Sequence, residues 1–183
     1  KALLGAAWDD AATAADESVM NEAHGTGTAL GDPIEAGSLV TAVLLAREMP
    51  LLVGGVKANI GHAEPAAGMT GLVKLVLNRR LSEAAPNAQL RSLNPHVGGA
   101  LCDVVYTLPT QLAARALGSG GVSSFGYSGT IAHAVLAFGH GPVRDAFVFG
   151  RAAGSLEVLA FGSRCADQAG GPVSERYSER DKE

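Results

Sequence analysis

The chain has 183 residues, of which 47% are apolar and 17% are charged, and its formal net charge at pH 7 is −4. This length is enough for one domain with a sizeable core, and the composition excludes a disordered or fibrous protein. The basic residues are scattered without interleaved aromatic residues, and each apolar stretch is shorter than about 18 residues, so we expect neither nucleic-acid binding nor a membrane span.

Two cysteines, Cys102 and Cys165, lie far apart and form no CxxC pair. A disulfide framework is therefore not expected, and a reducing compartment, the cytoplasm, is the predicted location. The chain begins at Lys1, without a methionine or a signal-like segment. We therefore expect a fragment of a longer protein, whose targeting segment would not be visible here.

The first half of the chain predicts a helix end, a strand and a helix. Residues 1–17 indicate the end of a helix and a loop, and residues 18–23 a short buried strand that delivers His24. Asp32 is a good N-cap for a helix that begins at Pro33, and Glu35 completes a capping-box spacing. One face of this helix carries apolar residues at helical spacing: Ala36, Leu39, Val40, Val43 and Leu44.

The second half predicts further alternation of strands and helices. Residues 51–56 indicate a buried strand and residues 57–65 a loop. A helix is expected from near Pro65, with Met69, Leu72, Val73, Val76 and Leu77 on its apolar face. Residues 82–110 are loop-rich, with a turn at 93–97, and residues 120–138 read as two antiparallel strands joined by a glycine turn. This pattern predicts an α/β protein with helices packed against a mixed sheet.

The loop between the first strand and its helix places His24 among small and hydroxyl-bearing residues. Three kinds of site are open: a phosphate site, a metal site and an acid/base site. A phosphate site is disfavoured because the stretch GTGTALG (25–31) lacks the GxGxxG and GK[ST] patterns. A metal site is disfavoured because the histidines form no HxxxH or HxxH pair.

A second histidine, His62, repeats this arrangement of strand end, loop, imidazole and helix. Two histidines at strand ends can converge at one edge of a sheet, where sites of α/β folds are found. Two neutral imidazoles can donate hydrogen bonds to one oxygen and stabilise developing negative charge. Lys57, five residues before His62, would favour the neutral form of a nearby imidazole.

Four stretches together resemble a known family: EAHGTGTALGDPIEA (22–36), GGVKANIGHAEPAAGMTGLVK (54–74), LNPHV (93–97) and GVSSFGYSGTIAHAVL (121–136). They are similar to the C-terminal half of β-ketoacyl synthase (ketosynthase) domains, most of all those of type I polyketide synthases. The resemblance covers residues 1–138. Residues 139–183 match no family in this way and are expected to be a linker or a poorly ordered tail.

The resemblance implies a thiolase-like fold, of which this half is a mixed five-stranded sheet with helices, usually within a homodimer. It implies a decarboxylative Claisen condensation, in which a malonyl unit on an acyl carrier protein extends an acyl chain in polyketide or fatty-acid biosynthesis. The expected partners are that carrier protein and the N-terminal ketosynthase half. No cofactor or metal is expected to bind directly, and the phosphopantetheine arm of the carrier presents the substrate.

The resemblance also implies roles for individual residues. His24, His62 and Lys57 match the catalytic histidines and lysine of the family. The matched substrate-binding positions are Thr26, Thr28, Tyr127, Gly129 and Thr130, with Tyr127 where the family has a gating phenylalanine. Two departures stand in the glycine turn: Ser128 replaces a glycine, and Ile131 replaces an asparagine. A positive φ at Ser128 would cost about 1 kcal/mol.

The nucleophilic cysteine of the family lies in its N-terminal half, and neither Cys102 nor Cys165 has the serine-rich setting of that residue. Two hypotheses follow. The chain is part of a condensing acyltransferase and inactive alone, or it is a non-catalytic module that dimerises or docks a carrier protein. Retention of both histidines, the lysine and the two threonines Thr26 and Thr28 favours the enzyme.

Overall fold

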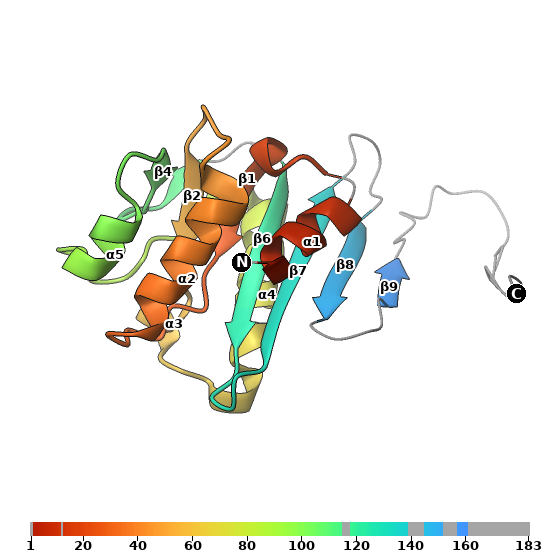
Figure 1. Cartoon of the computed structure of the whole chain (residues 1–183). Coiled ribbons are helices and arrows are strands. Elements are labelled where there is room, and N and C mark those ends of the chain that lie inside the picture. Colours follow the sequence, from red (N-terminus) through yellow and green to blue (C-terminus); the bar gives the residue numbers. More distant parts are fainter. Residues whose placement is uncertain (1, 12, 115–117, 139–144, 152–156, 161–183) are drawn as a thin grey trace, which may run out of the picture.

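The protein is described by a computed structural model that covers residues 2–11, 13–114, 118–138, 145–151 and 157–160. One twisted sheet forms the middle layer. Helices α1 (Ala2–Asp10) and α2 (Gly31–Leu39) cover one face, and α4 (Ala67–Leu81) covers the other (Figure 1). This is the α/β arrangement that the alternating pattern predicted.

The main sheet has seven strands in the described ranges, in the order β4-β2-β1-β6-β7-β8-β9. The strands β4, β2, β1 and β6 run parallel, and β6, β7, β8 and β9 pair antiparallel. Their bounds are β1 (Ser18–Glu22), β2 (Leu51–Gly54), β4 (Tyr106–Thr107), β6 (Ser119–Phe125), β7 (Ile131–Phe138), β8 (Asp145–Arg151) and β9 (Glu157–Ala160). A separate small pair joins β3 (Glu83–Ala84) to β5 (Ala113–Ala114).

Residues 1–138 supply five of these strands, β4, β2, β1, β6 and β7, so the expected mixed five-stranded sheet is confirmed. The strands β8 and β9 extend the sheet at the β7 edge. Part of the segment expected to be a linker therefore pairs with the sheet. That the ketosynthase-like domain ends at residue 138 stays a prediction.

Several short helices stand where the sequence indicated loops or turns. The loop expected over residues 57–65 contains the helix α3 (Lys57–Ile60), and the turn at LNPHV begins the helix α5 (Pro95–Ala100). Asn94 caps α5, because its side chain accepts the backbone N–H of His96 at 2.9 Å. The remaining turns are η1 (Ala15–Glu17), the π-helical turn η2 (Val40–Leu44), which continues α2, and η3 (Glu64–Ala66).

Two apolar cores lie on opposite faces of the sheet, as expected for strands buried on both sides. Along β2, Leu51 and Val53 pack under α1 and α2, whereas Leu52 packs under α4. The predicted apolar face of α2 is confirmed, because Ala36, Leu39, Val43 and Leu44 are all buried. The two cores fix α2 and α4 on the strands that carry the histidine loops.

The predicted cap of α2 is wrong. This helix begins at Gly31, and Leu30, its N-cap residue, makes no side-chain cap hydrogen bond. The Asp32 carboxylate instead accepts the backbone N–H groups of Gly27 and Thr28 in the preceding loop. The capping-box spacing misled because Glu35 also turns away from the helix start and binds backbone of the His24 loop.

The predicted inner face of α4 is also wrong in part. The residues turned to the sheet are Ala67, Gly71, Lys74, Leu75 and Asn78. By contrast, Met69, Val73 and Leu77, predicted to be inside, are about half exposed or more, at 61%, 51% and 49%. The inner face has room only for small residues at Gly71, where a Cβ would lie 3.2 Å from Val122 Cγ2.

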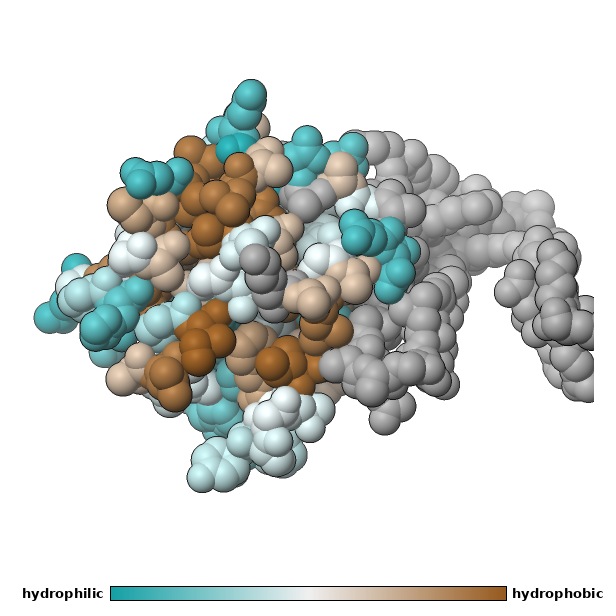
Figure 2. All heavy atoms as spheres, in the orientation of Figure 1, coloured by the Kyte–Doolittle hydropathy of each residue, from teal (hydrophilic) through white to brown (hydrophobic). Residues whose placement is uncertain are grey.

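Apolar side chains also remain exposed on the face of α1 and α2. Figure 2 shows apolar surface over both ends of α2; the exposed residues there are Leu30 and Ile34 at its start, and Leu45 and Met49 beyond its end. None of the helices in the described ranges is long and apolar enough to cross a membrane.

Candidate active site

Three parallel strands end at one edge of the sheet. Glu22, the last residue of β1, is in register with Gly54 of β2 and with Val122 of β6. The chain segments that follow these positions carry His24, Lys57 with His62, and Phe125. The carboxyl ends of parallel strands meet at the same edge, so the topology gathers these side chains from distant parts of the sequence.

The imidazoles of His24 and His62 lie together, with ring centroids 5.7 Å apart and planes at 89°. The predicted convergence of the two histidines is therefore confirmed as geometry. Phe125 stacks on the His24 ring, with centroids 5.7 Å apart and an interplanar angle of 19°. Phe125 is not among the residues that the sequence predicted for the site, because only the β1–β6 pairing brings it to His24.

The backbone at His24 is held by the side chain of Glu35, which belongs to α2. The buried Glu35 carboxylate accepts the backbone N–H of His24 at 2.7 Å and that of Gly25 at 2.9 Å. His24 is only 7% exposed. Burial first, and then the charges of Lys57 and His62, lower the pKa of His24 to about 4, so its imidazole is neutral at neutral pH.

The side chain of His62 is exposed, but its ring is oriented by its own loop. Its Nδ1 accepts the backbone N–H of Glu64 at 2.9 Å. A ring nitrogen that accepts carries no proton, so in neutral His62 the proton stands on Nε2. The Nε2–H group of His62 is thus available as a hydrogen-bond donor.

Lys57, the first residue of α3, supplies positive charge beside these imidazoles. Burial lowers the pKa of Lys57, while the carboxylates of Glu35, Glu22 and Asp32 act in the opposite direction. Its charge contributes to the lowered pKa of His24. The expectation that Lys57 favours a neutral imidazole therefore applies to His24.

The threonine loop is tied to the start of α2. The side-chain oxygens of Thr26 and Thr28 lie 3.3 Å apart, and Thr28 Oγ1 accepts the backbone N–H of Gly31 at 3.1 Å. Asp32 accepts the N–H groups of Gly27 and Thr28 at 3.1–3.3 Å. These contacts fix both hydroxyl groups relative to the start of α2.

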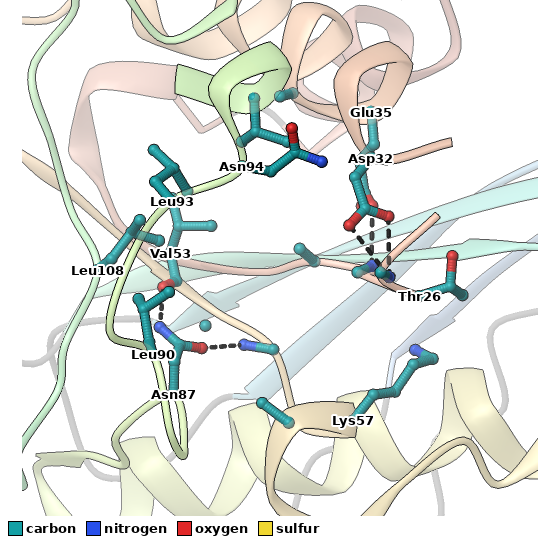
Figure 3. Close-up of a pocket in the computed structure, with 18 of the residues that line it drawn as sticks. Thr26, Asp32, Glu35, Val53, Lys57, Asn87, Leu90, Leu93, Asn94 and Leu108 are labelled. Atoms are coloured by element: carbon teal, nitrogen blue, oxygen red, sulfur yellow. Dashed lines mark hydrogen bonds between the residues drawn. The ribbon is translucent and has the colours of Figure 1, made fainter. Parts of the chain in front are cut away.

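A pocket of about 580 Å³ opens beside the histidines, between α2, α3 and the segment 87–94. His62, Lys57, Thr26 and the two neighbours of His24, Ala23 and Gly25, line it. Figure 3 shows apolar side chains on one side (Val53, Leu90, Leu93 and Leu108) and Thr26, Asp32, Glu35 and Lys57 on the other. The pocket therefore has one apolar wall and one polar wall, and a chain-like ligand with both kinds of group can fit between them.

One wall of this pocket is fixed by Asn87. Its Nδ2 donates to the carbonyl oxygen of Val53 at 3.1 Å, and its Oδ1 accepts the backbone N–H of Gly55 at 2.7 Å (Figure 3). The segment 87–94 is thereby attached to the end of β2, from which Lys57 and His62 follow.

The remaining predicted substrate-binding residues lie in the turn between β6 and β7. Tyr127 is fully exposed at its tip, and the turn is closed by hydrogen bonds from Gly126 to Thr130 and from Gly129 to Gly126. The positive φ of this turn, 88°, falls at Gly129, not at Ser128, so the serine carries no left-handed strain. The substrate roles of Tyr127, Gly129 and Thr130 stay predictions.

Cys102 has none of the features of an activated nucleophile. Its side chain is exposed just beyond α5, and the neighbouring Asp103, by hydrogen bond and charge, raises the pKa of its thiol. A raised pKa reduces the thiolate fraction that nucleophilic attack requires. Cys165 lies outside the described residues.

Residues 1–91 match the family described as β-ketoacyl synthase, C-terminal domain. The chain belongs to the β-ketoacyl synthase family. Its relatives include a phenolphthiocerol/phthiocerol polyketide synthase of Mycobacterium tuberculosis, 43% identical over 74% of this chain. Erythronolide synthase EryA2 of Saccharopolyspora erythraea is 44% identical over 67% of it. This ketosynthase chain is thus related to type I polyketide synthases.

Solved ketosynthase domains share the fold. An oxazolomycin ketosynthase domain of Streptomyces albus matches 77% of this chain with a TM-score of 0.68 and 37% identity. The module 6 ketosynthase of the Bacillus subtilis bacillaene synthase matches 73% with a TM-score of 0.65 and 29% identity. The thiolase-like fold is therefore confirmed. The chain spans 26% of each of these domains, and 7% and 4% of the two curated relatives.

Proposed function

We propose that this chain supplies the C-terminal half of the active site of a condensing acyltransferase, a ketosynthase that extends an acyl chain with a malonyl unit. The observation that carries the proposal is the pair His24 and His62, whose imidazoles stand 5.7 Å apart on separate loops. A scaffold that only dimerises or docks has no need for a neutral, buried imidazole opposite an oriented second one.

The proposed chemistry begins with decarboxylation. The bond from the malonyl carbon to its carboxylate breaks, carbon dioxide leaves, and the electron pair forms an enolate. Its oxygen receives hydrogen bonds from His24 and from Nε2–H of His62, donors that are in place before the charge develops. The enolate carbon then bonds to the carbonyl carbon of an acyl thioester, whose thiolate leaves.

The thiolate that holds the acyl group would come from the N-terminal half of the domain, since neither cysteine of this chain has a nucleophile's setting. The malonyl unit would arrive on the phosphopantetheine arm of an acyl carrier protein. Thr26 and Thr28, in the loop that follows His24, offer hydroxyl groups for the amides of that arm. The pocket next to His62 and Lys57 has the mixed polar and apolar walls that such an arm requires.

The test is the decarboxylation of malonyl carrier protein by a complete ketosynthase domain whose C-terminal half is this chain, followed as carbon dioxide release. His24→Ala and His62→Ala should each lower the rate by about 10²–10³-fold, the usual effect of losing one preorganised donor. His96→Ala, an exposed histidine of α5, is the matched control and should leave the rate unchanged. An unchanged rate in both site variants would refute the proposal and favour the non-catalytic module.

The chain of 183 residues alone should not condense acyl groups, because a thioester must first be held by an activated thiolate. Acyl and malonyl carrier proteins are supplied, and β-ketoacyl product is measured by mass spectrometry. Product that forms above the buffer rate and disappears in Cys102→Ala or Cys165→Ala would assign that cysteine as the nucleophile and contradict this part of the proposal.

A further inference from the structure

The side chain of Glu22 lies fully buried at the end of β1, two residues before His24. Its two oxygens have different partners. Oε1 accepts the backbone N–H of Val56, and Oε2 accepts from Lys74 Nζ of α4 at 2.7 Å. The ion pair is buried on both sides, with side-chain exposures of 0% for Glu22 and 10% for Lys74.

The partners of Glu22 bracket the segment that carries the second histidine. Val56 directly precedes Lys57, and α4, which carries Lys74, begins five residues after His62. One carboxylate near His24 therefore fixes the chain both before and after the loop of His62, and it joins β1 to the end of β2 and to α4.

Two glycines make room for this contact. A Cβ on Gly54 would lie 2.7 Å from Glu22 Oε2 and 2.8 Å from Lys74 Nζ. A Cβ on Gly71, in the middle of α4, would lie 3.3 Å from Glu22 Cγ. A glycine inside a helix or strand loses more conformational entropy on folding than another residue would. The two glycines that admit the ion pair therefore lower the stability of β2 and α4.

Stability alone is a weak explanation for the pair. Burying two charges costs desolvation energy, and well-packed apolar residues in the place of a buried ion pair are often as stable or more stable. What an apolar pair cannot supply is an acceptor for the buried N–H of Val56 and a directional bond to α4. These are the features that set the relative position of the two loops.

We infer that the Glu22–Lys74 ion pair positions His24 and His62 relative to each other, so that both imidazoles can reach one oxygen. Glu22 and Lys74 are positioning residues, because they touch the backbone and helix behind the site and not the reacting atoms. This inference rests on the proposed function for its catalytic consequence, although the geometric effect can be measured without any activity.

Double variants test the inference, since removal of one partner would leave a buried unpaired charge. Glu22→Leu with Lys74→Leu removes both bonds, and Glu22→Gln with Lys74→Met keeps an acceptor for Val56 only. Asn78→Leu is the matched control, because Asn78 is a buried polar residue of α4 one turn beyond Lys74.

The first measurement is an NMR titration of the histidine rings in the full chain. In the double leucine variant, the pKa of His24 should rise from about 4 toward 6.5 as the loops separate and water enters. His133, also buried with a pKa of about 4 but on β7, is an internal control and should not change. Equal rises at both histidines would mean general loosening and would overturn the inference.

The second measurement is malonyl decarboxylation in the complete domain. The double leucine variant should lower kcat by about ten- to a hundredfold with KM nearly unchanged, as expected for misplaced groups. The glutamine and methionine double variant should lower kcat less, and Asn78→Leu should not lower it. An unchanged kcat and an unchanged His24 titration in both double variants would overturn the inference.

The two proposals fail in different ways. If His24→Ala and His62→Ala both leave decarboxylation unchanged, the proposed function fails whatever the double variants do. If His24→Ala abolishes the rate while the double leucine variant keeps it, only the positioning role fails. Should the double leucine variant not fold, the glutamine and methionine variant decides, with the same two measurements.

Discussion

Glu35 holds the backbone of His24 from eleven residues further along the chain: its Oε1 accepts the His24 N–H at 2.7 Å, and its Oε2 accepts the Gly25 N–H at 2.9 Å. The side chain is buried, and α2 packs on the sheet through Ala36 and Leu39. The position of His24 thus depends on how α2 is seated, and not only on the end of β1.

Glu35→Ala should lower the free energy of unfolding by about 2 kcal/mol or more, because the buried N–H of His24 and the partly buried N–H of Gly25 lose their acceptor. Glu35→Gln keeps one carbonyl oxygen and should cost less. Chemical denaturation of the full chain gives both values. Glu48→Ala, at an exposed position, is the control and should stay within about 0.5 kcal/mol of the parent. A similarly small effect of Glu35→Ala would mean that water replaces the carboxylate at no cost.

Asp32→Ala should loosen the threonine loop and leave the start of α2 intact. The carboxylate accepts from Gly27 and Thr28, so those amides should exchange faster with solvent, at a cost of about 1 kcal/mol. Hydrogen exchange followed by NMR distinguishes the loop from the helix. Faster exchange in the first turn of α2, with Gly27 and Thr28 unchanged, would restore Asp32 as a helix cap.

Phe125→Ala should raise the pKa of His24 from about 4 toward 6.5. Burial is the largest cause of the low pKa of His24, and the stacked Phe125 ring covers one face of the imidazole. NMR titration of His24 provides the measurement. Tyr127→Ala is the matched control, since Tyr127 is fully exposed in the adjoining turn. Equal titration curves for the parent and Phe125→Ala would show that other groups bury His24.

The sequence was sufficient to predict the main strands β1, β2, β6 and β7, the helices α2 and α4, and the convergence of His24 and His62, because strand ends and helix starts have local signals. It did not predict the short helices α3 and α5 or the strands β8 and β9. It was misleading at Asp32 and Glu35. Their spacing matches a capping box, yet both carboxylates bind loop backbone that only the folded arrangement presents. A capping pattern identifies candidate acceptors but not which N–H groups they meet.

Two contacts between distant segments could not be predicted from the sequence. Phe125 reaches His24 through the parallel pairing of β1 with β6, and Glu22 meets Lys74 across 52 positions of the chain. On α4, helical periodicity predicted an apolar inner face, but the sheet side carries Gly71 and Lys74 because the helix lies close over Glu22. When a helix carries apolar residues on more than one side, as α4 does, residue periodicity does not reveal which side faces the sheet.

His133 should make the chain less stable as the pH falls from about 6.5 to about 4. It is 2% exposed, its Nδ1 lies 3.0 Å from Ser123 Oγ, and burial lowers its pKa to about 4. Between these pH values the unfolded chain binds a proton that the folded chain does not. The free energy of unfolding therefore falls as acid is added. One pKa unit corresponds to about 1.4 kcal/mol, so the loss is on the order of 3 kcal/mol.

The comparison with His133→Asn isolates this effect, because the asparagine amide can still form a hydrogen bond with Ser123 but does not titrate. The lowered pKa of His24 also makes the folded chain less stable in acid, whereas burial raises the pKa of Glu22 and Glu35 and so has the opposite effect. These contributions are the same in the parent and in the variant, so they cancel in the difference. The difference in unfolding free energy between parent and variant should therefore shrink as the pH falls from 6.5 to 4. A constant difference would show that His133 binds its proton in the folded chain.

The exposed face of α4 leads to a prediction about self-association. Met69, Val73, Leu77 and Leu81 stand four residues apart along one side of the helix, and each is about half exposed or more. A continuous apolar stripe of this kind marks an interface or an aggregation site. The full chain should therefore associate as its concentration rises, and Val73→Lys with Leu77→Glu should keep it monomeric without loss of stability, because neither side chain is in a core. Sedimentation velocity measures the mass of both proteins, with Leu112→Lys, an exposed leucine outside the stripe, as control. Association that persists in the double variant and disappears in Leu112→Lys would mean that the chains associate through a surface other than α4.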